Sequence, residues 1–216
     1  RLARRQVAAF HGQYLQKSAG PRLIEAKPHS GLRMVVVIPC HDEPDLVGAV
    51  ERLANCEPPL GQAEVIVVIN GSEKDAPAVT RQNLRTLTQA TGWLAKRSDH
   101  WLPIHLLHFP DVPPKHAGVG QARKTGMDEA LRRLAAVGQA EDGLLVCYDA
   151  DCRCSANYFT GIESHIAEHP AAPGCSIHFE HPLDAGEWSA LGFGGDAPAQ
   201  EVFDGIAAYE LHLRYH

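Results

Sequence analysis

Short apolar runs alternate with stretches of helical periodicity along most of this 216-residue chain. The runs are too short for buried helices and are bounded by Pro, Gly or polar residues, which favours strands. We interpret as strands residues 34–38, 64–69, 104–109, 144–148 and 175–179. Strands that alternate with helices predict an α/β fold in which a mostly parallel central sheet carries helices on both faces.

The stretches between the strands predict amphipathic helices, because apolar residues recur there at helical spacing. We expect helices to begin near Pro44, Pro77, Gly118 and Ser155, and to span residues 2–17 and 201–215. Residues 184–200, which are rich in Gly and Ala, are expected to form a loop.

The size and charge of the chain favour one domain with a basic arm. A chain of 216 residues can bury one sizeable core. The net charge is −6, yet residues 1–33 are rich in Lys and Arg, so we expect a basic N-terminal helix or arm that packs on a domain of residues 34–216. Because the chain starts with Arg and stops inside an apparent helix, we expect it to be truncated at the C-terminus.

The sequence lacks several patterns that indicate other classes of protein. No apolar run approaches the roughly 20 residues of a membrane span, no secretory h-region follows the basic start, and no aromatic-plus-basic pattern indicates a nucleic-acid partner. The six cysteines do not suggest a disulfide framework, and Cys152-x-Cys154 lacks the spacing of a zinc knuckle. We therefore expect a soluble, cytoplasmic protein with no transmembrane segment.

The fourth apolar run ends in two acids one residue apart, Asp149 and Asp151. In open α/β sheets, ligands bind at the carboxyl ends of strands, where these two carboxylates would lie. Two hard oxygen donors this close can hold Mg²⁺ or Mn²⁺, which commonly bridges to substrate phosphates. An Asp-rich turn is the alternative interpretation. Polar turns at residues 40–43 and 70–72 also follow strands, and the topology brings all three turns to one rim.

Four segments in order resemble the motifs of glycosyltransferase family 2. The resemblance covers about residues 34–165 and implies the nucleotide-sugar half of a GT-A-type, Rossmann-like three-layer sandwich. The segments are Val-Val-Ile-Pro-Cys-His-Asp-Glu (36–43), Val-Val-Ile-Asn-Gly-Ser (67–72), Gly-x-Gly-x-Ala-Arg-Lys-x-Gly (118–126) and Tyr-Asp-Ala-Asp (148–151).

The resemblance implies a role for each matched residue in binding a nucleotide sugar, most naturally a UDP- or GDP-sugar. The nucleoside pocket would be lined by Pro39, His41 and Glu43, with Asn70 near the base or ribose. The diphosphate or sugar would be met by Lys115, Gly120 and Arg123, the ribose or sugar by Asp149, and the metal by Asp151 with Asp149. For Glu43, Lys115 and Arg123, a helix cap, a loop lysine and a solvated helix charge are the simpler alternatives.

The chain departs from the family pattern at two points. Ile69-Asn70 replaces the paired acids that the family carries after its second strand, which places the usual base or ribose contact in doubt. The family also needs a carboxylate that deprotonates the acceptor hydroxyl in an inverting transfer. No convincing motif supplies it here, and the candidates for this base are Asp196, Glu201 and Asp204, with Glu210 as a further acid.

The resemblance, together with the two acids after the fourth strand, therefore implies a metal-dependent glycosyltransferase that moves a sugar from a nucleotide diphosphate to an unknown acceptor hydroxyl. Inversion in this transfer is implied by the resemblance alone. Two other functions stay open: a non-catalytic nucleotide-binding or scaffold domain that keeps the GT-A fold, and a nucleotidyltransferase. An Asp-x-Asp phosphatase is disfavoured, because such an enzyme carries its acids on the first strand.

Overall fold

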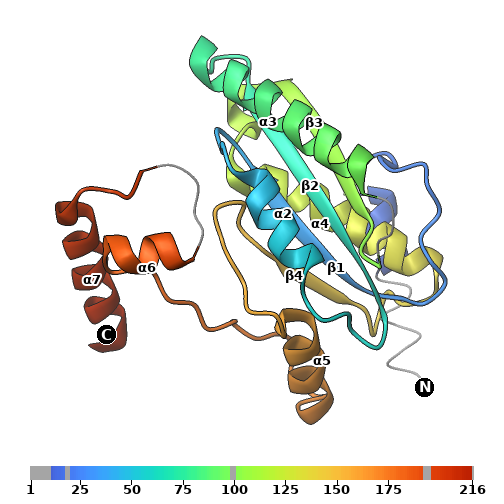
Figure 1. Cartoon of the computed structure of the whole chain (residues 1–216). Helices are drawn as coiled ribbons and strands as arrows, with labels where there is room; N and C mark the ends of the chain where they lie inside the picture. The colour runs from blue at the N-terminus through green and yellow to red at the C-terminus, as the bar shows by residue number, and fades with distance from the viewer. Residues whose placement is uncertain (1–10, 18–19, 98–100, 192–195, 216) are drawn as a thin grey trace. The chain divides into compact units, whose positions relative to one another are not determined.

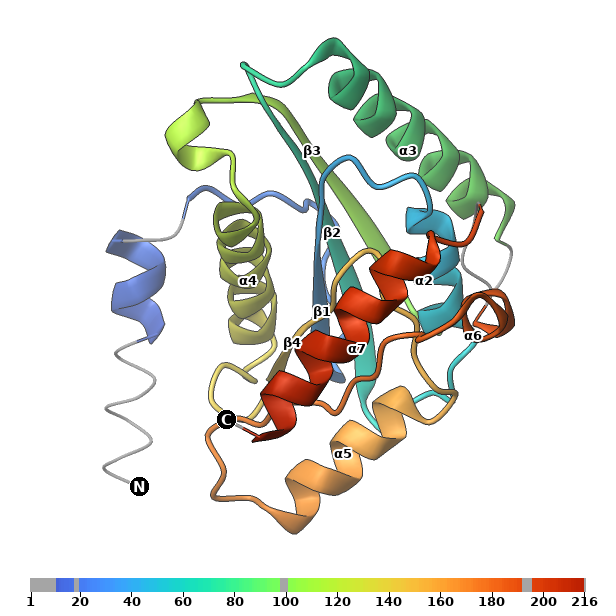
Figure 2. The same ribbon diagram turned by 90° about the vertical axis from the view of Figure 1, so that its left-hand side faces the viewer.

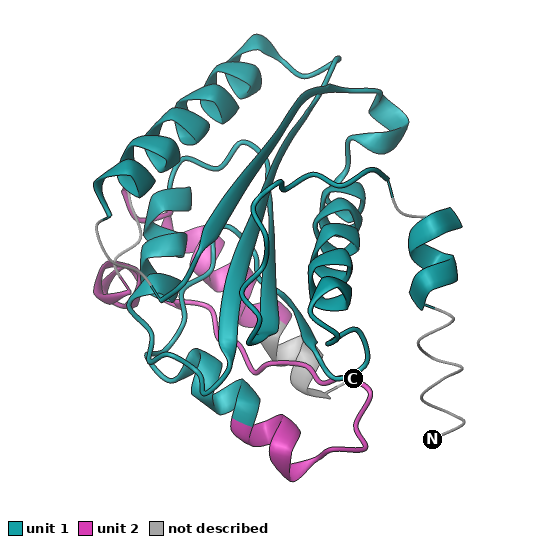
Figure 3. Ribbon diagram, turned by 90° about the vertical axis from the view of Figure 1, so that its right-hand side faces the viewer, with its two compact units in different colours: residues 1–163 teal, residues 164–216 magenta. Residues whose placement is uncertain are grey.

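The structure is a computed structural model that describes residues 11–17, 20–97, 101–191 and 196–215 (Figure 1). The chain forms two compact units, Arg1–Glu163 and Ser164–His216 (Figure 3). Their boundary lies inside helix α5 (Tyr158–Glu168). The expected division between residues 33 and 34 stays a prediction.

Four parallel strands form the central sheet, in the order β3-β2-β1-β4. They are β1 (Leu32–Cys40), β2 (Gln62–Ser72), β3 (Ile104–Val112) and β4 (Leu144–Cys147). In β1, Val36 lies beside Val65 of β2 on one side and Val146 of β4 on the other. The strand order reverses between β1 and β4, which makes this the topological switch point of a Rossmann-like sheet. The predicted α/β class with a parallel sheet between helices, as in GT-A-type domains, is confirmed.

Helices cover both faces of the sheet. Figure 2 shows α2 (Leu46–Ala54) and α3 (Pro77–Lys96) on one face and α4 (Val119–Ala136) on the other. Alternate residues of β1 point to opposite faces, so Val36 packs in one cluster with residues of α2 and α3, and Val37 in a second cluster with residues of α4. Coverage on both faces explains why β1 and β2 are almost continuously apolar.

Helix α4 approaches the sheet closely through a glycine. A Cβ built on Gly126 would lie 2.4 Å from Cγ1 of Val37, a distance that real side chains do not reach. Ala122, Ala130 and Leu134 extend the same buried face of the helix. This packing fixes the position of the amino-terminal turns of α4, which lie at the carboxyl edge of the sheet.

The N-terminal segment is bound to α4 by polar contacts. Backbone N–H groups of Leu23 and Ile24 donate to the carboxylate of Glu129, at 3.1 and 3.3 Å. Ahead of this segment, residues 11–17 are helical, and Tyr14 donates a 2.8 Å hydrogen bond to Asp128. Residues 1–10 of the expected helix at 2–17 lie outside the described residues.

Two expectations for residues 164–216 are wrong and one is confirmed. Residues 175–179 form no strand: their backbone is irregular, and Ile177 and Phe179 are exposed. Alternating apolar residues make a strand only where a neighbouring strand offers hydrogen bonds and a surface to pack on. Within the expected loop at 184–200, Ala185–Ala190 forms helix α6. The C-terminal helix is present as α7 (Gln200–Tyr215).

Among the described residues, no helix combines the length and the apolar character that crossing a membrane requires.

Candidate functional site

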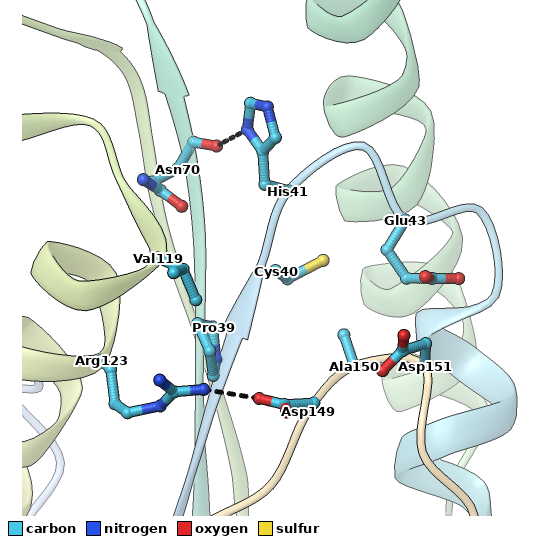
Figure 4. Close-up of a pocket in the computed structure, with 10 residues that line it drawn as sticks. All are labelled: Pro39, Cys40, His41, Glu43, Asn70, Val119, Arg123, Asp149, Ala150 and Asp151. Atoms are coloured by element: carbon cyan, nitrogen blue, oxygen red, sulfur yellow. Dashed lines mark hydrogen bonds and ion pairs between the residues drawn. The ribbon is translucent and has the colours of Figure 1, made fainter. Parts of the chain in front are cut away.

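A cavity of about 420 Å³ opens at the carboxyl edge of the sheet, at the switch point between β1 and β4. Figure 4 shows the side chains around it, which come from the end of β1 and the turn after it, the end of β2, the first turns of α4 and the turn after β4. The lining residues are Pro39, Cys40, His41, Glu43, Asn70, Val119, Arg123, Asp149, Ala150 and Asp151. The three polar turns expected at one rim therefore do meet around one cavity.

Arg123 and Asp149 form an ion pair across this cavity. Nη2 of Arg123 lies 2.6 Å from Oδ1 of Asp149, and the two side chains are 32% and 56% exposed. The pair joins helix α4 to the turn after β4 (Figure 4). It holds a guanidinium at the cavity wall, in a position where an anionic ligand would meet it.

The carboxylates of Glu43 and Asp151 lie on the same side of the cavity (Figure 4). Burial raises the pKa of Glu43, and the negative charges of Asp151 and Asp45 raise it further, although a 2.8 Å hydrogen bond from the Asp45 backbone N–H and the charge of Arg153 oppose the shift. Negative charges that repel one another in this way favour a cation between or beside them. Glu43 and Asp151 are thus the acids best placed to meet one.

The donor set of the cavity fits a hard divalent ion such as Mg²⁺ or Mn²⁺. Such ions take oxygen ligands and are often held by only one or two carboxylates, with phosphate oxygens and water completing the shell. Asp151 and Glu43 supply oxygens of that kind, whereas Asp149 is engaged by Arg123. In the part of the chain that the structure describes, no group of three or more His, Cys, Asp or Glu side chains is arranged to hold a metal by itself.

Asn70 has a structural role that an acid could not fill. Its buried side-chain amide donates a 2.7 Å hydrogen bond to the carbonyl oxygen of Ala117, just before α4. The backbone carbonyl oxygen of Asn70 accepts a 3.2 Å hydrogen bond from the side-chain amide of Asn83. The same oxygen lies 2.9 Å from Nδ1 of His41, which donates in the tautomer protonated at that nitrogen. Asn70 therefore ties the end of β2 to both walls of the cavity, and a carboxylate at this position would have no proton for Ala117.

The turn after β1 is held by two buried polar residues of α3. Asp42 adopts a positive φ of 54°, which Asp tolerates better than most residues, and its N–H donates a 2.8 Å hydrogen bond to Oδ1 of Asn83. The hydroxyl of Thr86 donates a 2.6 Å hydrogen bond to the carbonyl oxygen of Glu43. Neither Asn83 nor Thr86 is assigned a role from the sequence alone.

A second ion pair fixes the turn after β4. The almost fully buried side chain of Arg153 binds Asp45, whose carboxylate also accepts the N–H of Gly48 at 3.2 Å and so caps helix α2. A Cβ on Gly48 would lie 2.9 Å from the Arg153 guanidinium, so the glycine leaves room for it. Sequence reasoning missed this contact.

The remaining predicted residues lie outside the cavity lining. Lys115 is exposed in a short 3₁₀ helix, Pro114–His116, and Gly120 is the second residue of α4. The candidates for the base, Asp196, Glu201 and Asp204, are exposed residues of the second compact unit. Their roles stay predictions.

No family model matches this chain, and no curated protein matches it. Among solved structures, the crystal structure of S. aureus TarS 1–349 is similar, with 19% sequence identity and a TM-score of 0.40. The match covers 68% of this chain and 39% of that one, so this chain spans well under half of its length. The fold class follows from the strand order and the helical layers, and not from this similarity.

Proposed function

We propose that this chain is the donor-binding domain of a glycosyltransferase of the family 2 type, which binds a nucleoside diphosphate sugar together with Mn²⁺ or Mg²⁺. The observation that supports the proposal is the meeting of Glu43, Arg123, Asp149 and Asp151 around one cavity at the switch point of a parallel sheet. The carboxylates favour a bound cation, and the guanidinium of Arg123 can bind an anion. A diphosphate that carries a divalent metal ion meets both requirements.

The proposed roles follow from the positions of the side chains. Asp151, with Glu43 beside it, would hold the metal, and Arg123 would meet the diphosphate once the ligand competes with Asp149 for the guanidinium. His41 and Asn70, at the far wall, would border the nucleoside. The bound ion would neutralise charge on the diphosphate as it leaves.

The acceptor half of the reaction is also a proposal. We propose transfer to a hydroxyl group with inversion, as the family resemblance implies, and Asp196, Glu201 or Asp204 as the base. Asn70 favours a second candidate, a domain that binds the nucleotide without transferring a sugar, because this residue holds the end of β2 in place of the family's acid.

Calorimetric titration with UDP, GDP, ADP and dTDP, with and without Mn²⁺, tests the donor site. The native chain is compared with Asp151→Ala and with Asp111→Ala, which removes an exposed acid outside the cavity lining. We expect one nucleotide to bind in a metal-dependent manner, to lose that dependence in Asp151→Ala and to keep it in Asp111→Ala. If the folded native chain binds none of the four nucleotides, the proposal fails for this chain. Binding without transfer or hydrolysis of the matching sugar donor would favour the second candidate.

A further inference from the structure

Two cysteines that are 98 positions apart in the sequence lie side by side in the first compact unit. Sγ of Cys56 is 3.6 Å from Sγ of Cys154. Cys56 follows Asn55, the C-cap of helix α2, and Cys154 lies in the turn after β4, three residues beyond Asp151. The contact belongs to neither the sheet nor the cavity lining.

Hydrogen bonds hold the backbone segments of the two cysteines next to each other. The N–H of Glu57 donates a 2.8 Å hydrogen bond to the carbonyl oxygen of Ala156, which links the residue after Cys56 to the second residue after Cys154. The thiol of Cys56 also lies 3.3 Å from the carbonyl oxygen of Arg52 and 3.4 Å from that of Ser155. The two sulfur atoms are therefore neighbours because of the fold rather than because of one flexible rotamer.

The electrostatic surroundings favour a thiolate at one of the two positions. A hydrogen bond from Cys56 lowers the pKa of the Cys154 thiol, and although burial opposes this shift, Tyr148, Arg52 and Arg153 also lower the pKa. The same hydrogen bond, together with burial, raises the pKa of Cys56. Cys154 is half-buried and Cys56 is buried. A partly exposed thiolate beside a buried thiol is the arrangement found where one cysteine reacts first and the other resolves the product.

We propose that Cys56 and Cys154 are the site of a reversible disulfide, formed when the protein meets a peroxide. The Cys154 thiolate attacks one peroxide oxygen, the O–O bond breaks, and a sulfenic acid and hydroxide form. Cys56 then attacks the sulfenic sulfur, the S–O bond breaks, and the leaving hydroxide takes up the thiol proton of Cys56 to become water. The hydroxide formed in the first step becomes water by taking up the proton that the Cys154 thiol had released. The two sulfur atoms lose two electrons in total, and the peroxide is reduced to two waters. A dithiol reductant reverses the change by thiol–disulfide exchange.

The new bond needs only a short movement. A disulfide places its sulfur atoms about 2.05 Å apart, so the two atoms must approach by roughly 1.5 Å. The bond would tie the turn that carries Asp151 to the C-terminal end of α2, while Arg153 already binds Asp45 at the N-terminal end of that helix. This modification site goes beyond the proposed function and does not depend on it.

Peptide mapping after peroxide treatment tests the proposal. The reduced chain is treated with hydrogen peroxide, alkylated, and digested with trypsin and a Glu-specific protease. Trypsin cuts after Arg153 and so separates Cys152 from Cys154, and cleavage after Glu163 separates Cys154 from Cys175. We expect a linked peptide pair that contains Cys56 and Cys154, lighter by two hydrogen atoms, which dithiothreitol separates.

The controls use the other cysteines of the chain. Cys56→Ser and Cys154→Ser should each abolish the linked pair, whereas Cys152→Ser and Cys175→Ser, which change exposed cysteines, should leave it unchanged. The same treatment in urea should give less of this pair, because only the folded chain holds the two sulfur atoms together. Peroxide that leaves Cys56 unlinked in the folded chain, or that joins Cys154 to Cys152 or Cys175 instead, overturns the proposal.

Discussion

Arg123 of helix α4 donates a 2.6 Å hydrogen bond to Asp149, the first acid of the Asp-Ala-Asp turn after β4. Because of this contact, the two acids of the turn have different surroundings. Asp149 is neutralised by a cation of the protein itself, whereas Asp151 lies beside Glu43 and contributes to the raised pKa of that carboxyl. The two acids are one residue apart in the sequence, yet their surroundings favour different roles.

Replacement of Arg123 by Ala should weaken nucleotide binding far more than it affects folding. Ion pairs this exposed contribute about 0–1 kcal/mol to stability, so the urea midpoint should change little. A hydrogen bond to a charged ligand is worth about 1.5–3 kcal/mol, which predicts a loss of roughly tenfold or more in affinity for the nucleoside diphosphate that binds the native chain.

Calorimetry with that nucleotide measures the effect, and two variants serve as controls. Arg123→Lys should retain part of the affinity, because it keeps the charge but not the planar fork of donors. Arg85→Ala removes an exposed arginine of α3 and should change nothing. Equal affinity in Arg123→Ala and the native chain would show that the guanidinium does not meet the diphosphate.

Asn70→Asp should destabilise the protein, although it introduces the acid that the motif of glycosyltransferase family 2 carries at the matching position. The carboxylate cannot donate to the carbonyl oxygen of Ala117, and the position is buried. Loss of a buried hydrogen bond partner costs about 1–3 kcal/mol. Urea unfolding monitored by circular dichroism gives the difference. A variant that is as stable as the native chain and binds nucleotide more tightly would contradict this account of Asn70.

The layers of the fold could be predicted from the sequence because they depend on local periodicity. Apolar runs such as 34–38 and 64–69 predict strands. Because parallel strands share one carboxyl edge, the sequence also predicts that the polar turns after these strands meet at that edge. The polar contacts that hold those turns leave no such signal. Arg153 and Asp45 are 108 positions apart, and Thr86 and Glu43 are 43 apart, so only the folded chain brings them together.

The errors in the second unit have a physical cause as well. The run at 175–179 has the alternation of a strand but no strand beside it, and periodicity alone carries no information about partners. Helix α6 did have a local signal. Asp184 caps the helix by accepting the N–H of Glu187 at 2.8 Å, and Glu187 in turn accepts the N–H of Leu183, the residue before the cap, at 2.7 Å. The spacing Asp-x-x-Glu is that of a capping box, although the second bond goes to the residue before the N-cap.

Two glycines of α4 should respond in opposite ways to replacement by Ala. In Gly126→Ala the new methyl would meet Val37 at 2.4 Å and push the helix from the sheet, at a cost of about 1–3 kcal/mol. In Gly120→Ala it meets nothing within 4 Å, so the helix should gain up to about 1 kcal/mol from the better helix former. Thermal unfolding of both variants tests this contrast. Similar losses in both would mean that α4 does not pack as closely as the structure shows.

The buried ion pair between Glu64 and Arg133 should make the protein sensitive to acid. Arg133 binds both oxygens of Glu64, at 2.5 and 3.0 Å, and both side chains are 3% exposed. Burial raises the pKa of Glu64, but the hydrogen bonds from His105 and Arg133 outweigh this effect and bring the pKa down to about 2. The unfolded chain, with its ordinary pKa near 4.5, therefore takes up the proton first as the pH falls.

The contribution of Glu64 should be fully present above pH 4.5 and be lost as the pH falls toward 2, by about 3 kcal/mol over that range. Urea unfolding at a series of pH values measures it. Glu64→Gln should be about 3–5 kcal/mol less stable at pH 7, because the Arg133 guanidinium is left buried without its counter-charge, yet it should lose this part of the pH dependence. Glu73→Gln, which changes an exposed carboxylate, should follow the native curve. If Glu64→Gln kept the same fall in stability between pH 4.5 and 2, the acid sensitivity would have to come from other carboxylates.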